Sequence, residues 1–204
     1  MTLASRANAR VARVVRRDDV SHTCPGLHQP CLWYSTMGHA NSRESLILRW
    51  TELCDDPGWK DWPGKIELNG LGVIEMSPAS NRHGRLQALI AVALEAQLKG
   101  AAFVECSVLT DDGVRVPDVA WASPEFMARH GMVTPFPSAP EICIEVRSPT
   151  NTDAEMAFKV DLFLRAGAVE AWVVDADGAV HVFDANGARA ASRFGVTLDL
   201  RMPP

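Results

Sequence analysis

The sequence predicts a mixed α/β domain in which a single mixed sheet is flanked by two main helices. Apolar residues recur at helical spacing in two segments, 80–99 and 152–167. The stretches beside these segments contain short apolar runs, and Asp-Gly turns join two pairs of them. The predicted order is therefore strand, helix, hairpin, strand, helix and two further strands. A chain of 204 residues is long enough to bury such a core.

The first predicted strand leads directly into the first predicted helix. Residues 72–76 form a short strand that ends at Pro78. Ser80 or Asn81 then caps a helix that runs to about Lys99, since leucine, isoleucine and alanine recur along it every three or four residues. This helix presents one apolar face to the sheet.

A hairpin and a buried strand follow. Residues 103–109 and 114–121 are strand-like, and the turn between them, 110–113, contains the Asp-Gly pair that supplies the positive φ angles of a tight hairpin. Residues 142–146 are apolar apart from one acid, which is typical of a strand buried on both faces.

The second helix and the last strands complete the predicted domain. Thr152 and Glu155 have the spacing of a capping box, and an apolar stripe follows them as far as Gly167. Residues 171–175 and 180–184 then form two strands around an Asp-Gly turn.

The first 40 residues differ from the rest in composition. They hold five arginines and two aspartates, a net charge of +3. Because the whole chain has a net charge of −5, the remaining residues carry a net charge of −8. We expect a disordered basic arm at 1–40, a folded domain at 41–187 that begins with a polar, turn-rich segment, 50–77, and a tail or edge strand at 188–204. An alternative interpretation is that Met37 is the natural start.

Composition excludes several classes of protein. No apolar run approaches the roughly 20 residues of a membrane span. The five cysteines are few and odd in number, which does not fit the paired cysteines of a secreted disulfide framework. We therefore expect a cytoplasmic protein with no membrane contact. No glycine-rich phosphate loop indicates a nucleotide-binding fold. Cys24, His28 and Cys31 have ligand types that suit zinc, but a fourth ligand would have to come from His22 or His39 in the same arm, which we expect to be disordered.

Three charged residues stand in apolar surroundings and require an explanation. They are Asp118, Glu145 and Lys159. Ionised groups inside apolar strands are costly unless they are paired or hold a metal. If the two acids lie on adjacent strands they converge, and a hard cation such as Mg²⁺ or Mn²⁺ would offset their repulsion. Lys159 lies at the rim of its helix stripe, from which it can reach the same site and position a metal-bound water.

Four motifs stand in order along the chain: Val-Pro-Asp-Val at 116–119, Pro-Glu-Ile-Cys-Ile-Glu-Val-Arg-Ser-Pro-Thr at 140–150, Lys159, and Gly-Ala-Val-Glu-Ala-Trp-Val-Val-Asp at 167–175. Together they resemble the bacterial putative restriction endonuclease family of the PD-(D/E)XK nuclease superfamily, over about residues 65–185. The resemblance implies a restriction-endonuclease-like fold.

The resemblance also implies roles for individual residues. Asp118 and Glu145 would be the metal ligands, with the Val146 carbonyl as a main-chain ligand. Lys159 would be the active-site lysine, displaced from the strand onto the following helix. His83 matches the family's histidine at the start of the first helix.

Arg147 departs from the superfamily motif, in which the residue two places after the acid is usually the lysine itself. Arg147 could share the role of Lys159. The alternative is that Arg147 pairs with an exposed acid, because an arginine stays protonated and cannot exchange a proton with water.

We therefore expect a metal-dependent endonuclease that hydrolyses DNA phosphodiester bonds with a metal-activated water; the sequence leaves a homodimer open. The net charge of −8 opposes DNA binding unless basic residues form a local groove, for which the candidates are Arg82, Arg85, Arg115 and Arg147. The alternatives are a catalytically silent domain that binds nucleic acid or protein, and a domain whose three charges form ordinary salt bridges.

Overall fold

The structure is a computed structural model, and it describes residues 42–59, 64–78 and 80–200. The helices are α1 (Arg43–Asp55), the 3-10 helix η2 (Pro57–Trp59), α2 (Asn81–Gln97), α3 (Pro124–His130) and α4 (Asp153–Arg165). The strands are β1 (Gly64–Leu68), β2 (Ile74–Pro78), β3 (Ala101–Val104), β4 (Val108–Thr110), β5 (Gly113–Arg115), β6 (Val119–Ala122), β7 (Ile142–Val146), β8 (Glu170–Val174), β9 (Val180–Asp184) and β10 (Gly187–Arg189).

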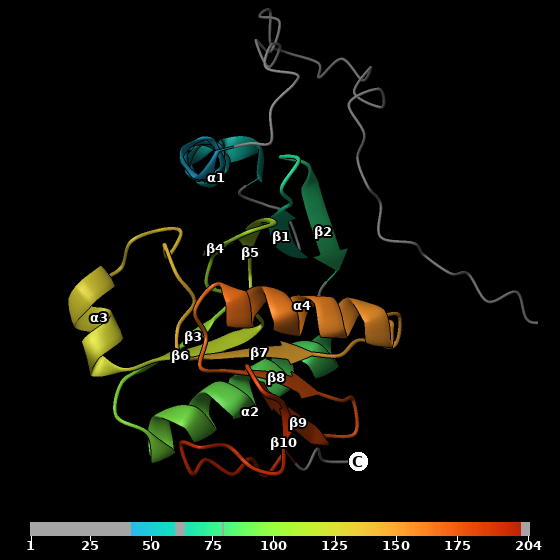
Figure 1. Ribbon diagram of the computed structural model, residues 1–204. Coiled ribbons are helices and arrows are strands. Elements are labelled where there is room, and N and C mark those ends of the chain that lie inside the picture. Colours follow the sequence, from blue (N-terminus) through green and yellow to red (C-terminus); the bar gives the residue numbers. More distant parts are fainter. Residues whose placement is uncertain (1–41, 60–63, 79, 201–204) are drawn as a thin grey trace, which may run out of the picture.

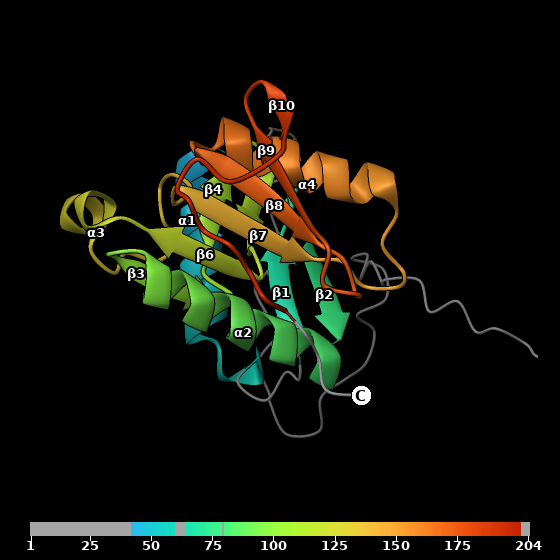
Figure 2. The ribbon, with the colours of Figure 1, turned by 90° about the horizontal axis from the view of Figure 1, so that it is seen from below.

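A six-stranded mixed sheet forms the centre of the fold, in the order β10-β9-β8-β7-β6-β3. Strands β7 and β8 pair in parallel, and their other neighbours pair antiparallel. Helix α2 covers one face and α4 the other (Figures 1 and 2). Side chains alternate along each strand, so Ile144 and Trp172 pack with α2 while Cys143 and Val173 pack with α4. The predicted mixed sheet with two flanking helices is confirmed.

A second sheet, which the sequence analysis did not predict, has the order β2-β1-β5-β4. It packs with α1 around a core that includes Trp50, Leu68 and Val114 (Figure 1). The expectation of a single sheet was therefore wrong. The segment 50–77 was interpreted as polar and turn-rich because Pro-Gly pairs stand at 57–58 and 63–64, yet residues 64–68 form strand β1, in which Glu67 and Leu68 are buried.

The predicted hairpin connects the two sheets. Its ends pair as β3 and β6 in the large sheet, and its tip pairs as β4 and β5 in the small one. Three residues on each side separate Val104↔Val119 from Val108↔Arg115, so the register continues across the gap. Gly113 at the tip has φ +92, and a Cβ there would lie 1.9 Å from the Leu68 carbonyl oxygen. The hairpin carries the chain from the small sheet to Asp118, immediately before β6.

The predicted starts of both main helices are confirmed. The Ser80 side chain accepts the His83 N–H at the start of α2. Thr152 and Glu155 form a complete capping box at the start of α4. These caps fix where each helix begins, and therefore which residues face the sheet.

The termini were predicted from composition alone. The expectations for residues 1–40, including the zinc candidate, lie outside the described residues. Residues 190–200 pack on the α2 face of the large sheet, with Val196 and Leu200 in its core. Among the described residues, no helix is long and apolar enough to cross a membrane.

Candidate active site

Asp118 and Glu145 come together because their strands are neighbours. Strands β6 and β7 pair antiparallel with Val119 opposite Ile144, so the residue before β6 lies beside the end of β7. Both acids are buried, with 1% and 4% of their surface exposed. The Val146 N–H donates a 2.7 Å hydrogen bond to Asp118 Oδ2 and fixes that carboxylate against the end of β7. The convergence that the sequence predicted is present.

Lys65 of β1 lies between these two carboxylates. Its Nζ is 2.7 Å from Asp118 Oδ1 and 3.5 Å from Glu145 Oε2. The same ammonium donates a 2.9 Å hydrogen bond to the Val116 carbonyl. A single cation therefore already bridges the two acids, and it comes from the small sheet.

Lys159 reaches Glu145 from α4. Its Nζ lies 3.1 Å from Glu145 Oε2 and 3.5 Å from Oε2 of Glu67, which is the second charged residue of β1. The other oxygen of Glu67 accepts the Val116 N–H at 2.9 Å. We call Lys65, Glu67, Asp118, Glu145 and Lys159 the ionic cluster. Its contacts run from Asp118 through Lys65, Glu145 and Lys159 to Glu67, so the charges alternate in sign and Glu145 lies between two ammonium groups.

Burial and neighbouring charges shift the pKa values of the cluster in different directions. Burial raises the pKa of Glu145 to about 7, and the ammonium groups of Lys159 and Lys65 offset this only in part. Burial acts in the same sense on Asp118, but Lys65 and His83 outweigh it and hold the pKa of Asp118 below its usual range. Burial disfavours the charged lysines, yet the surrounding carboxylates raise the pKa of both. Glu145 is therefore the more readily protonated of the two converging acids.

Glu67 also remains ionised. Burial opposes its charge, but Lys159, Lys65 and Arg115 outweigh burial and lower its pKa to about 2. Its position 3.5 Å from the Lys159 Nζ gives that ammonium a second carboxylate partner besides Glu145. Glu67 thus helps to hold Lys159 over the end of β7.

His83 stands at the start of α2, where the resemblance located a histidine. Its Nε2 lies 3.2 Å from Asp118 Oδ1. The hydrogen bond to Asp118 raises the pKa of His83. His83 is half-buried and opposes the movement of the Asp118 carboxylate away from Lys65.

The donor atoms that could hold a hard divalent cation are few. Glu145 Oε1 is buried and has no hydrogen-bond partner among the described residues, so it is free to coordinate. The bridging position of the Lys65 ammonium marks a point where positive charge is stabilised by both acids. Across the part of the chain that the structure describes, no group of three or more His, Cys, Asp or Glu side chains is arranged to hold a metal. Two carboxylates fit Mg²⁺ or Mn²⁺, which fill their remaining positions with main-chain oxygen, water and phosphate.

The four arginines predicted to contact DNA do not form one exposed groove. Arg115 is only 6% exposed, and it pairs with Glu67, Glu75 and Asp112. The expectation that Arg115 contributes to a DNA-binding surface was wrong, because burial in β5 satisfies its guanidinium within the protein.

The remaining arginines lie nearer the surface. Arg82 donates to the Ala176 carbonyl, and Arg147 pairs with Asp153 and Asp175. Both are therefore at the turn between β8 and β9, and Arg85 is exposed on α2. Arg147 shows the pairing with an exposed acid that the sequence analysis kept as an alternative. A phosphate contact by Arg82, Arg85 or Arg147 stays a prediction.

Two members of the ionic cluster, Lys65 and Glu67, were missed by the sequence analysis. Both lie on one face of β1, two residues apart, and Ile66 lies between them on the other face. This alternation of charge with apolar residues was the available signal, but it is also typical of a surface strand. Only the packing of the small sheet against Asp118 and Glu145 turns that face inward.

Comparisons with known proteins identify a family to which this chain is similar. The model of the Uma2 family, described as "Putative restriction endonuclease", matches residues 60–202. This match confirms the family resemblance that the motifs predict. A solved structure of a putative nuclease belonging to DUF820, from Anabaena variabilis, is 19% identical, with 65% of this chain and 83% of that chain covered and a TM-score of 0.48. No curated protein matches the chain.

Proposed function

The chain belongs to the Uma2 family of putative restriction endonucleases, and on this premise we propose that it is a metal-dependent endonuclease that hydrolyses DNA phosphodiester bonds. The observation that carries the proposal is the convergence of Asp118 and Glu145 beneath the Lys159 ammonium, which lies 3.1 Å from Glu145 Oε2. Two carboxylates can hold a hard divalent cation, and a lysine beside them can offset charge that develops on a phosphate.

Asp118 and Glu145 would hold Mg²⁺ or Mn²⁺, with the Val146 carbonyl as a further ligand. Such an ion, when bound, lowers the pKa of its water and offsets charge on the phosphate. Asp118 remains ionised at neutral pH, and its Oδ2 is held by the Val146 N–H. Glu145 contributes the unpaired Oε1.

Lys159 orients the attacking water and offsets charge that develops on the phosphate oxygens, because its ammonium lies 3.1 Å from Glu145 Oε2 and is held there by Glu67 as well. His83 acts as a positioning residue for Asp118. In the hydrolysis itself, the water oxygen forms a bond to phosphorus while the bond from phosphorus to the leaving sugar oxygen breaks.

A DNA cleavage assay tests the proposal. The purified protein is incubated with supercoiled plasmid and with single-stranded circular DNA, in Mg²⁺, in Mn²⁺ and in chelator. We expect cutting in either metal and none in chelator, and Glu145→Gln should abolish it. Asp161→Asn, the same change at an exposed acid of α4, should cut like the parent.

Two results would contradict the proposal. Cutting that persists in chelator would exclude a metal-activated water. Absence of cutting on every DNA form, by protein that is shown to be folded, would favour the alternative that the domain binds nucleic acid or protein without catalysis.

A further inference from the structure

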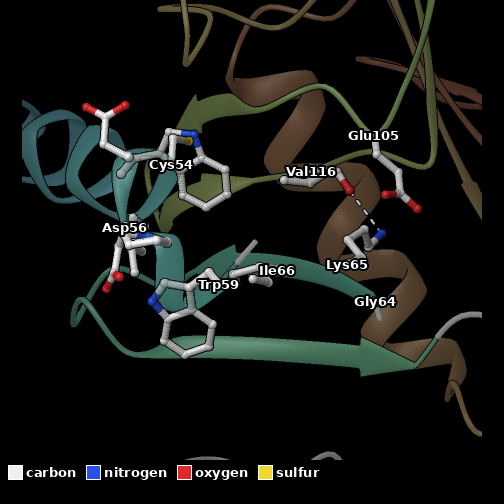
Figure 3. Close-up of a pocket in the computed structure, with 12 residues that line it drawn as sticks. Cys54, Asp56, Trp59, Gly64, Lys65, Ile66, Glu105 and Val116 are labelled. Atoms are coloured by element: carbon white, nitrogen blue, oxygen red, sulfur yellow. Dashed lines mark hydrogen bonds between the residues drawn. The ribbon is translucent and has the colours of Figure 1, made fainter. Parts of the chain in front are cut away.

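A cavity of about 490 Å³ opens beside the ionic cluster, between α1, η2 and β1. Two indoles, Trp50 and Trp59, are part of its wall. Figure 3 shows Trp59 on one side of the cavity and Lys65 and Val116 on the other. The volume is within the range of small-molecule sites, about 300–1,000 Å³.

Lys65 connects this cavity to the candidate active site. It lines the cavity, and its Nζ bonds both the Val116 carbonyl and Asp118 Oδ1. Val116 lines the cavity as well, and its N–H holds Glu67 of the ionic cluster. Lys65 therefore lines the cavity and also contacts both carboxylates of the candidate active site.

The charges around the cavity restrict what can enter it. Asp55, Asp56 and Glu105 contribute to its lining, and the ammonium of Lys65 is already shared between two carboxylates. A phosphate group would meet these three acids without a free cation among the described lining residues, so the cavity disfavours it. An uncharged aromatic ring with amino groups would stack on the Trp59 indole and donate hydrogen bonds to the acids.

We propose that this cavity binds an unstacked nucleobase that is adjacent to the phosphate at the ionic cluster. The inference rests on the proposed function and specifies its substrate class. A base inside a duplex is stacked and paired, and it cannot enter a side pocket without leaving the helix. The substrate is therefore single-stranded or locally unpaired DNA.

Equilibrium binding tests the proposal without cleavage. The protein is titrated in Ca²⁺ into one of two short fluorescent single strands of equal length, one intact and one abasic. Fluorescence anisotropy gives the dissociation constant for each strand. Stacking of one base on an aromatic side chain predicts that the parent binds the intact strand about tenfold more tightly than the abasic strand. Trp59→Ala should remove this preference, and Trp59→Phe should retain most of it.

A matched control separates the cavity from the rest of the surface. Phe158 is an exposed aromatic residue of α4, 47% exposed and outside the cavity lining, so Phe158→Ala should leave the preference intact. Circular dichroism establishes that each variant is folded. A Trp59→Ala protein that still prefers the intact strand, or a parent without any preference, would overturn the proposal.

The plasmid assay keeps this failure distinct from failure of the proposed function. A protein that cuts DNA in Mg²⁺ but shows no preference for bases would retain the nuclease function and refute the cavity. A protein that shows the Trp59-dependent preference but never cuts would retain the cavity as a nucleotide site and refute the nuclease.

Discussion

Lys159 and Glu145 are joined by a 3.1 Å contact between Nζ and Oε2, although one belongs to helix α4 and the other to strand β7. The capping box of Thr152 sets the start of α4 only a few residues after β7 ends, so the side chain of Lys159 is directed back over that strand. The Arg147 guanidinium, which follows Glu145 by two residues, instead contacts Asp153 and Asp175. Arg147 therefore occupies the place of the lysine in the strand motif, whereas Lys159 is the cation that contacts Glu145.

This difference predicts that Lys159, and not Arg147, is the cation required for turnover. Lys159→Ala should reduce the cleavage rate at saturating DNA by about a hundredfold or more, the scale of losing one group that stabilises charge in the transition state. Mn²⁺ should still bind, since both carboxylates remain. Arg147→Ala should weaken DNA binding and leave the saturating rate within about threefold of the parent.

Single-turnover cleavage with varied DNA, together with calorimetry of Mn²⁺ binding, separates rate from affinity in each variant. If Lys159→Ala cuts like the parent while Arg147→Ala is inactive, the assignment is refuted and the strand arginine takes the role.

The ionisation of Glu145 predicts how stability changes with pH in chelator. Burial raises its pKa to about 7 from a usual value of 4.5, so the folded protein binds a proton more tightly there than the unfolded chain does. The Glu145 contribution to stability is therefore present at low pH and is lost as pH rises from 4.5 through 7. Glu145→Gln, which is neutral at every pH, should gain in Tm relative to the parent between about pH 5 and about pH 8.

Thermal denaturation of both proteins across this range measures the difference. Asp161→Asn, which removes the charge of an exposed acid of α4, serves as the control. A parent that becomes more stable than Glu145→Gln as pH rises would mean that the lysines favour the Glu145 carboxylate more than burial penalises it.

Much of the large sheet could be predicted from the sequence because its signals are local. Three such signals are present in the structure: the helix caps at Ser80 and Thr152, and the hairpin turn with the Asp-Gly pair at 112–113. Each depends on only a few adjacent residues. The convergence of Asp118 and Glu145 needed one non-local assumption, that β6 and β7 are neighbours, which the register of Val119 with Ile144 satisfies.

The small sheet was not predicted because its signals are non-local. Strand β1 contains Lys65 and Glu67, whose burial is compensated by partners 48 to 92 residues away along the chain, as in the Arg115–Glu67 and Lys159–Glu67 contacts. The Pro-Gly pairs at 57–58 and 63–64 therefore indicated a polar, turn-rich segment. The same long-range pairing explains why Arg115 was mistaken for a surface residue, since the acids that surround it include Glu67 and Glu75 of the neighbouring β1 and β2.

We predict that replacing Glu170, which lies outside the ionic cluster, strongly lowers the stability of the protein. It is 1% exposed, and its carboxylate accepts the Trp172 indole N–H, the Ser192 hydroxyl and the Arg193 N–H. These bonds fasten residues 190–200 to the large sheet. Glu170→Ala would leave three donors without their acceptor, at about 1–3 kcal/mol for each one that stays buried, and should lower the midpoint of urea denaturation.

Glu170→Gln retains one carbonyl acceptor and should fall between the parent and Glu170→Ala. Asp177→Ala, a change at an exposed turn residue, is the control. Equal midpoints for parent and Glu170→Ala would show that the C-terminal segment does not depend on this carboxylate.

We predict that removing the charge of Lys65 increases the affinity of the protein for the metal ion. The ammonium lies 2.7 Å from Asp118 Oδ1 and 3.5 Å from Glu145 Oε2, the two acids proposed to hold the ion. Two unit charges about 4 Å apart interact by about 4 kcal/mol at an effective dielectric constant of 20. A tenfold change in affinity corresponds to about 1.4 kcal/mol, so the repulsion between the ammonium and a bound cation is large enough to weaken metal binding by more than tenfold.

Lys65→Met keeps an unbranched apolar side chain and should tighten Mn²⁺ binding at least about tenfold in calorimetry. Lys65→Arg keeps the charge and should bind Mn²⁺ like the parent, as should Lys99→Met, in which the lost charge is at an exposed position. Weaker Mn²⁺ binding by folded Lys65→Met would instead mean that Lys65 holds the two carboxylates in the geometry that the ion needs, and that the ammonium and the ion do not compete.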